Sequence, residues 1–264
     1  MSNWQTCSTE VADFVKQLME ETKKILGSHY IGFYLHGSLA MGGFNSNRSD
    51  VDFLIITKKG VSVQAKKELA QLYLFSSNKP YPIEMSILQE RHLKNWEHPS
   101  EYDFHFSEFW RERYKRDLET NGSEYLNAEV YKDSDLAAHI TITTERGICL
   151  DGEPIDRIFP IVPKEDYLSS ILIDFEECVE DINRHPIYSI HNMLRVYWYV
   201  KEEVISSKKE AGDWGITSLP RELRLTVEKA VHCIEDGEST YEFKQEELMT
   251  FTHYITKEVR SLTK

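Results

Sequence analysis

The sequence of 264 residues lacks the patterns that define several large protein classes. It has no apolar run near the ~20 residues that a membrane span requires. Residues 1 to 5 show neither the basic region nor the apolar core of a signal peptide. The formal net charge of -13 argues against nucleic acid as a partner, because phosphate binding needs a basic surface. We therefore expect a soluble, cytoplasmic and monomeric protein with no membrane or nucleic-acid partner.

Several common motifs for metal binding, phosphate binding and nucleophilic catalysis are also missing. The four cysteines lie far apart and form no C-x-x-C, so we expect free thiols rather than a disulfide or a zinc site. The ten histidines include no H-E-x-x-H. The absence of G-x-x-x-x-G-K-[ST] and G-x-G-x-x-G disfavours a P-loop or a Rossmann site, and no G-x-S-x-G elbow is present.

The stretch from Tyr30 to Thr57 contains the strongest pattern that is present. An apolar strand over 31 to 35 is followed by a Gly37-Ser38 turn, a connection rich in Gly and Asn, and a second apolar strand that opens with Asp50-Val51-Asp52. Side chains alternate along a strand, so both aspartates should point to the same face. Two carboxylates on one face can bind a divalent metal ion.

A third acidic residue follows on a short strand. Residues 83 to 88 alternate, with apolar side chains on one face and Glu84 and Ser86 on the other. Glu84 would join the aspartate pair if its strand lies next to the second strand. On spacing alone, a solvated glutamate on an edge strand is an equal alternative.

The pattern changes from alternating strand and helix to helix alone near Pro154, Pro160 and Pro163. Helical spacing is expected over 9–26, 62–75, 134–150, 165–182, 187–206, 219–234 and 244–262. The sequence therefore predicts an α/β domain with a mixed sheet over residues 1–155, followed by an all-helical bundle over residues 156–264. Ligands are often held at such a junction.

Two regional features leave alternatives open. Residues 151 to 264 contain 23 acidic and 14 basic residues, which favours cationic ligands but equally fits a surface that only keeps the protein soluble. Residues 92 to 127 are rich in aromatic side chains, Trp110 among them, which can line a pocket for a polar ring or belong to the core.

The Gly-Ser turn and the three acidic residues together indicate metal-dependent phosphoryl or nucleotidyl transfer. Gly37 permits a close backbone approach, and the Ser38 hydroxyl can donate to a phosphate oxygen. We expect His36 to be structural rather than a metal ligand.

Several stretches carry a resemblance to a known family: Leu35-His36-Gly37-Ser38 with Gly42-Gly43, Ser49-Asp50-Val51-Asp52, Glu84, Glu108-Phe109-Trp110-Arg111, Asp133-Ser134-Asp135-Leu136-Ala137, Arg195, and Ile205-Ser206-Ser207-Lys208 leading to Asp213-Trp214. The Gly-Ser and Asp-x-Asp pattern resembles the polymerase-beta-like nucleotidyltransferase superfamily. Over nearly its full length the chain is similar to the aminoglycoside O-adenylyltransferases that act on streptomycin and spectinomycin.

This resemblance implies Mg²⁺-dependent transfer of AMP from ATP to a hydroxyl of a cationic antibiotic. It implies a metal site at Asp50, Asp52 and Glu84, with Glu84 as general base. Nucleotide contacts are implied for Gly37, Ser38, Ser49, Asp135, Arg195 and Lys208, and antibiotic contacts for Trp110, Glu84, His185 and Tyr188.

The resemblance leaves the acceptor open. His185 and Tyr188 stand where the family has an acidic residue and an asparagine, and the tryptophan-containing loop linked to streptomycin is missing. Spectinomycin, streptomycin or both, and other acceptors such as a lincosamide or a protein, remain alternatives, as does a non-catalytic nucleotide-binding relative. The modified hydroxyl, the nucleotide preference and the binding order do not follow from the sequence.

Overall fold

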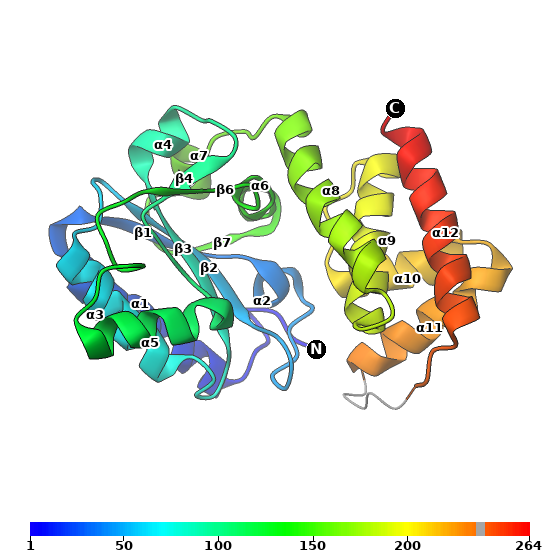
Figure 1. The fold of residues 1–264 in the computed structure, drawn as a ribbon, viewed down its shortest axis with the longest axis horizontal. Helices are drawn as coiled ribbons and strands as arrows, with labels where there is room; N and C mark the ends of the chain where they lie inside the picture. The colour runs from blue at the N-terminus through cyan, green and yellow to red at the C-terminus, as the bar shows by residue number, and fades with distance from the viewer. Residues whose placement is uncertain (236–240) are drawn as a thin grey trace. The chain divides into compact units, whose positions relative to one another are not determined.

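The computed structural model describes residues 1–235 and 241–264 (Figure 1). The chain divides into two compact units, Ser2–Asp166 and Tyr167–Lys264. Within the described ranges, no helix combines the length and the apolar character needed to cross a membrane.

The first unit is built on a mixed sheet, as the sequence predicts. Five strands lie in the order β5-β3-β2-β1-β7, and β4 and β6 form a separate pair. The strands are β1 (Tyr30–Leu35), β2 (Val51–Thr57), β3 (Ile83–Gln89), β4 (Ser100–Tyr102), β5 (Phe104–Phe106), β6 (Tyr131–Asp133) and β7 (Ile148–Gly152). β2 and β3 run parallel, whereas the other neighbours in the five-stranded sheet are antiparallel.

Helices cover both faces of this sheet. α1, α3 and α5 lie on one face and α6 on the other (Figure 1). The helical segments of the unit are α1 (Thr9–Leu26), η1 (Gly27–His29), α2 (Gly37–Met41), α3 (Val63–Ser76), α4 (Glu90–Lys94), η2 (Glu108–Trp110), α5 (Arg111–Thr120), α6 (Leu136–Arg146) and α7 (Ile155–Ile158). The main apolar core fills the space under α1 and α3, where Phe33 and Phe53 stack with ring centroids 4.4 Å apart.

α1 shows how closely the sequence specifies an element. The Ser8 side chain accepts a hydrogen bond from the Val11 backbone N–H, which caps the first turn. Gly27 ends the helix with a φ of 53°, a conformation that costs glycine little. The expected helix over residues 9 to 26 is confirmed.

Two expectations for this unit are corrected. The helix expected over 134 to 150 ends at Arg146, and residues Ile148–Gly152 form the edge strand β7 instead. Pairing with β1 overrides the helical spacing there, because it satisfies backbone groups at the sheet edge. Asp50 lies just before β2 and is exposed, so only Asp52 of the aspartate pair lies within the strand.

In the second unit, the described regular structure is helical only, in agreement with the predicted C-terminal fold. Its helices are α8 (Lys164–Asp181, which begins just before the unit boundary), α9 (Pro186–Glu202), α10 (Lys208–Ser218), α11 (Arg221–Glu235) and α12 (Gln245–Leu262). α10 was not expected, since Gly212 and Gly215 lower its helical propensity. These glycines allow close packing, because a Cβ at Gly212 would lie 2.9 Å from His191 Cε1.

Candidate active site

The parallel pairing of β2 and β3 brings two carboxylates together. The register pairs Val51 with Ile83 and Asp52 with Glu84. Paired residues on neighbouring strands lie about 5 Å apart and point to the same face. Asp52 and Glu84 are half-buried, while their flanking residues on both strands are buried. The open question about Glu84 is thereby answered, because its strand is the direct neighbour of the strand that carries Asp52.

The turn after β1 lies against the Asp52 carboxylate. The His36 backbone N–H donates to the Asp52 carbonyl at 3.0 Å, and Gly37 follows with a φ of 60°. A Cβ at Gly37 would lie only 1.9 Å from Asp52 Oδ2. Glycine is therefore required twice at this position, for the left-handed backbone and for the space that the carboxylate occupies.

Ser38 has the property expected of a phosphate contact. Its Oγ atom is buried and has no hydrogen-bond partner among the residues that the structure describes. Buried hydroxyls are normally satisfied, so an orphan hydroxyl next to two carboxylates fits a ligand that supplies the missing bond.

Ser49 and Asp50 lie in a tight connection before β2. The Ser49 Oγ accepts from the Asn45 backbone N–H at 3.0 Å, and the Ser49 N–H donates to the Asn45 carbonyl at 2.8 Å. The Ser49 hydroxyl still has a hydrogen to donate. This turn holds Asp50 at the entrance to the strand of Asp52.

Oxygen ligands for a divalent cation are present in Asp50, Asp52 and Glu84. Across residues 1–235 and 241–264, however, no three or more His, Cys, Asp or Glu side chains are already grouped as a metal site. The paired register of Asp52 and Glu84 and the orphan Ser38 hydroxyl nevertheless fit a cation together with its phosphate ligand.

Three histidines lie near the strands that carry the carboxylates, and the sequence pointed to only one of them, His36. His36 is buried next to His139 of α6, with ring centroids 5.1 Å apart. Burial, and then the neighbouring His139, lower the pKa of His36 well below its usual value. Burial also lowers the pKa of His105, although the nearby Glu84 opposes the shift. His105 Nδ1 lies 2.9 Å from the Ser86 Oγ, and Ser86 is two residues beyond Glu84. His36 and His105 are therefore neutral near pH 7.

Trp110 lies in a cluster of aromatic rings after β5. It stacks on Tyr114 at a centroid distance of 5.6 Å and meets the edges of Tyr125 and His105. The Arg113 guanidinium lies 5.0 Å from its ring. His105 thus lies between Trp110 and the neighbourhood of Glu84, and Trp110 is half-buried rather than open.

Asp135 occupies the cap position before α6. It is exposed, and its backbone N–H donates to Asp133 Oδ1 at 2.9 Å. α6 also carries His139, which contacts His36, so Asp135 begins the helix that covers the carboxylate face.

The second unit groups its own expected site residues. Arg195 donates through Nε to the Ser206 carbonyl at 3.0 Å and through an Nη to Asn192 Oδ1 at 3.2 Å. Lys208 Nζ lies 4.3 Å from the centroid of the Tyr188 ring. The segment before α10 is thus held by Arg195, and it presents Lys208 above an aromatic face.

His185 lies at the exposed N-terminus of α9, with no side-chain capping hydrogen bond. Tyr188, three residues later, is half exposed, and its hydroxyl donates to Asp174 Oδ1 at 3.4 Å. Of these two expected antibiotic contacts, only Tyr188 lies against another predicted site residue.

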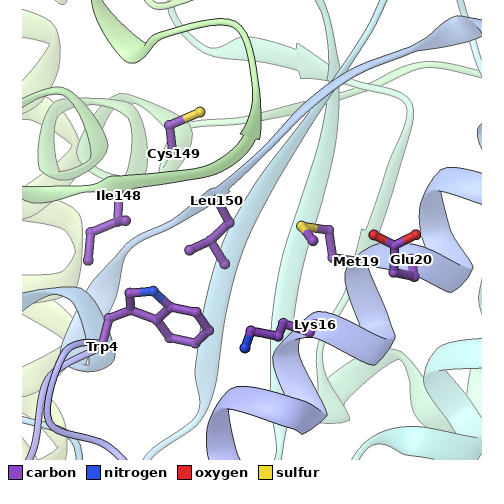
Figure 2. Close-up of a pocket in the computed structure, with 7 residues that line it drawn as sticks. All are labelled: Trp4, Lys16, Met19, Glu20, Ile148, Cys149 and Leu150. Atoms are coloured by element: carbon purple, nitrogen blue, oxygen red, sulfur yellow. The ribbon is translucent and has the colours of Figure 1, made fainter.

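A cavity of about 520 Å³ lies elsewhere in the first unit (Figure 2). It is lined by Trp4, by Lys16 and Met19 of α1, and by Ile148 and Leu150 of β7. Ile148 pairs with a β1 residue that faces α1, whereas Asp52 points to the opposite face. The sheet therefore separates this cavity from the carboxylates.

Comparison with protein-family models gives two matches. Residues 15–120 match the nucleotidyltransferase domain, and residues 157–258 match the C-terminal domain of aminoglycoside adenylyltransferase. The first match covers the Gly-Ser turn, Asp50, Asp52 and Glu84.

Individual relatives agree with these models. The chain is 26% identical over 215 residues to a spectinomycin 9-adenylyltransferase of Staphylococcus aureus, covering 78% of each protein. It is 23% identical over 255 residues to that of Campylobacter jejuni, covering 94% of this chain and 95% of the relative.

A solved structure has the same fold. It is the spectinomycin adenyltransferase of Enterococcus faecalis, determined with ATP and spectinomycin, and it is 22% identical with a TM-score of 0.78. The alignment covers 94% of this chain and 99% of the other.

The mixed sheet, the paired carboxylates and the Gly-Ser turn define a nucleotidyltransferase. With the matched C-terminal domain, the chain belongs to the aminoglycoside adenylyltransferases, as the sequence resemblance implies.

Proposed function

We propose that the enzyme transfers AMP from ATP to a hydroxyl group of spectinomycin and releases pyrophosphate, which makes it an antibiotic-resistance enzyme. The observation that carries the chemistry is the pairing of Asp52 with Glu84 on neighbouring parallel strands. The relatives named for spectinomycin support this acceptor ahead of streptomycin.

Glu84 is the proposed general base. Its carboxylate accepts the proton of the acceptor hydroxyl, whose oxygen then bonds to the α-phosphorus of ATP. The bond from that phosphorus to the bridging oxygen breaks, and pyrophosphate leaves with both electrons. Histidines kept neutral by burial, such as His36, add no positive charge that would compete for these carboxylates.

We propose that Asp50, Asp52 and Glu84 hold Mg²⁺ with the nucleotide. The bound cation supplies positive charge for the phosphates and orients them. Gly37 keeps the backbone clear of the Asp52 carboxylate, and the Ser38 hydroxyl donates to a phosphate oxygen. Ser49 and Asp135 complete the contacts proposed for the first unit.

In the second unit, Arg195 and Lys208 are the proposed partners of the triphosphate. Their charges suit phosphate oxygens, and the support for this role is their grouping around Ser206 to Lys208. Trp110, His185 and Tyr188 are the proposed contacts of the acceptor, since aromatic faces pack on sugar rings and attract ammonium groups.

The proposal also assigns the two domains, the oligomeric state and the location of the enzyme. We place nucleotidyl transfer in residues 1–155 and the helical domain in residues 156–264, and we propose a monomeric enzyme that works in the cytoplasm, where ATP is available. Nucleic acid has no part in this function.

The test is an acceptor panel. Enzyme, ATP and Mg²⁺ are incubated separately with spectinomycin, streptomycin and a lincosamide, and mass spectrometry measures the addition of AMP. We expect an adduct with spectinomycin that Asp52→Asn abolishes. An adduct with another compound but not with spectinomycin would refute spectinomycin as the acceptor. If no compound of the panel led to pyrophosphate release, the proposed adenylyl transfer would be refuted.

A further inference from the structure

The segment Glu108-Phe109-Trp110-Arg111 contains one ion pair, between Glu108 and Arg111. Its two partners lie on either side of Trp110 in the sequence. Arg111 donates from Nε to Glu108 Oε2 at 2.6 Å and from Nη2 to Glu108 Oε1 at 2.9 Å. The pair is therefore bidentate, the arrangement in which arginine and carboxylate match best. The short helix η2 and the start of α5 are fixed relative to each other, with Trp110 between the paired residues.

Arg111 also binds the end of a different helix. Its Nη1 donates to the Leu74 carbonyl at 3.0 Å, and its Nη2 donates to the Ser77 carbonyl at 3.1 Å. These carbonyls lie at the C-terminus of α3, where helical acceptors have no partner within the helix. One guanidinium thus joins Trp110 and its neighbours to the crossover helix between β2 and β3.

Ser77 extends this network to the strand of the proposed base. Its side chain is buried, donates to Glu108 Oε1 at 2.5 Å, and accepts from the Ile83 backbone N–H at 3.0 Å. Ile83 is the first residue of β3 and directly precedes Glu84. A continuous set of hydrogen bonds therefore runs from Arg111 through Glu108 and Ser77 to the backbone next to Glu84.

The charges in this network are only partly screened by solvent. The Arg111 side chain is 19% exposed and that of Glu108 is 37% exposed. The hydrogen bonds from Arg111, and less so the one from Ser77, lower the pKa of Glu108, so the carboxylate stays ionised and paired near pH 7.

We propose that Glu108 and Arg111 are positioning residues for the transfer reaction. Through Ser77 they hold the acceptor contact Trp110 and the general base Glu84 at a fixed separation. This inference rests on the proposed roles of Trp110 and Glu84. An acceptor hydroxyl that is misplaced by a fraction of an ångström loses transfer rate, because the attack requires alignment with the α-phosphate.

The test compares Arg111→Lys and Glu108→Gln with the wild-type enzyme. Lysine keeps the charge but cannot form the fork, and glutamine keeps the shape but loses the charge. We expect a rise of about tenfold in the KM of the acceptor and a fall of similar size in kcat, with the KM of ATP within about twofold of the wild type.

Glu112→Gln is the matched control. Glu112 pairs with Lys115 at 2.6 Å with the same i,i+3 spacing within α5, but its side chain is 80% exposed. We expect wild-type kinetics from this variant, because an exposed pair contributes little. Equal loss in Glu112→Gln and Glu108→Gln, or an unchanged acceptor KM and kcat in Arg111→Lys, would overturn the proposal.

A second measurement does not depend on the acceptor. Hydrogen exchange without ligands should become faster at the Ile83 amide and around Trp110 in Arg111→Lys, and stay unchanged in Glu112→Gln. Unchanged exchange in Arg111→Lys would overturn the positioning role by itself. If the wild-type enzyme modifies no acceptor, the proposed function fails, and the exchange result still decides whether the network holds β3.

Discussion

At the scale of single residues, Gly37 combines a left-handed backbone with close contact to the Asp52 carboxylate. Gly37→Ala would place a Cβ 1.9 Å from Asp52 Oδ2 and would also strain a backbone with a φ of 60°. The strain alone costs about 1–2 kcal/mol. We expect reduced stability in urea and a strong loss of pyrophosphate release, because the Asp52 carboxylate must move.

Gly27→Ala separates these two effects. Gly27 has a similar φ of 53°, but no atom of the described residues lies within 4 Å of its added Cβ. It should reproduce the strain while leaving activity per folded molecule intact. Equal activities in the two variants would show that the Asp52 carboxylate does not need its present place.

Glu84 allows the sharpest test of chemistry at one residue. Glu84→Gln keeps the size of the side chain but cannot accept the hydroxyl proton. We expect kcat to fall by ~10²-fold or more, a larger change than the rise in the KM of ATP that follows from a weaker metal site. Initial rates of pyrophosphate release measure both constants, and Glu101→Gln on β4 serves as the control. An unaltered kcat would remove Glu84 from the role of base.

At the scale of elements, the first turn of α10 decides how Lys208 is presented. Ser207 and Glu210 form a capping box, and the Ser207 side chain accepts from the Glu210 backbone N–H. Ser207→Ala should cost about 1 kcal/mol of stability. We also expect a higher KM for ATP, since the residue next to the lost cap is the proposed phosphate contact. Thermal melting and ATP titration of the rate provide the two readouts.

Ser62→Ala is the companion variant. Ser62 caps α3 by accepting from the Ala65 backbone N–H, and α3 carries none of the proposed nucleotide contacts. A similar loss of stability without a change in the KM of ATP is expected. If both variants changed that KM alike, the cap of α10 would have no particular link to the nucleotide.

Elements also show what the sequence could predict. Alternation at Ile83 to Leu88 and helical spacing in α1 specified these segments correctly, because each buries one face of its own. The register of Asp52 with Glu84 could not be predicted, since it depends on which strands become neighbours. β7 and α10 were missed for a related reason: pairing with β1 and packing against His191 outweigh local propensity.

The network around Arg111 is a further case. The spacing of Glu108 and Arg111 indicates an ion pair, but the partners at Leu74 and Ser77 depend on the fold. His139 likewise gave no signal, because a single histidine in an amphipathic helix has no pattern that identifies its neighbour.

At the scale of the whole molecule, acid should weaken both units through buried neutral histidines. Burial lowers the pKa of His191 to about 4, and it lowers that of His36 well below its usual value. Between about pH 4 and 6.5, His191 is protonated in the unfolded chain but stays neutral in the folded protein. The free energy of unfolding therefore falls by up to about 1.4 kcal/mol for each pH unit of acidification in this window.

Urea titrations at pH 7 and pH 5 measure this loss. His191→Asn removes the titrating ring while keeping a polar group near the Lys208 carbonyl, which lies 2.8 Å from His191 Nδ1. The contribution of about 2 kcal/mol between these pH values should then disappear. If the variant kept the full wild-type pH dependence, His191 would not be the group responsible.

The parallel pairing of β2 with β3 also sets the order in which a refolding chain becomes active. Helices form from neighbouring residues, whereas this pairing must close the crossover through α3, and non-local closure is slow. A refolding chain should regain its helical circular dichroism before it can release pyrophosphate. Enzymatic activity can therefore serve as a clock for the slowest long-range step in the assembly of this sheet.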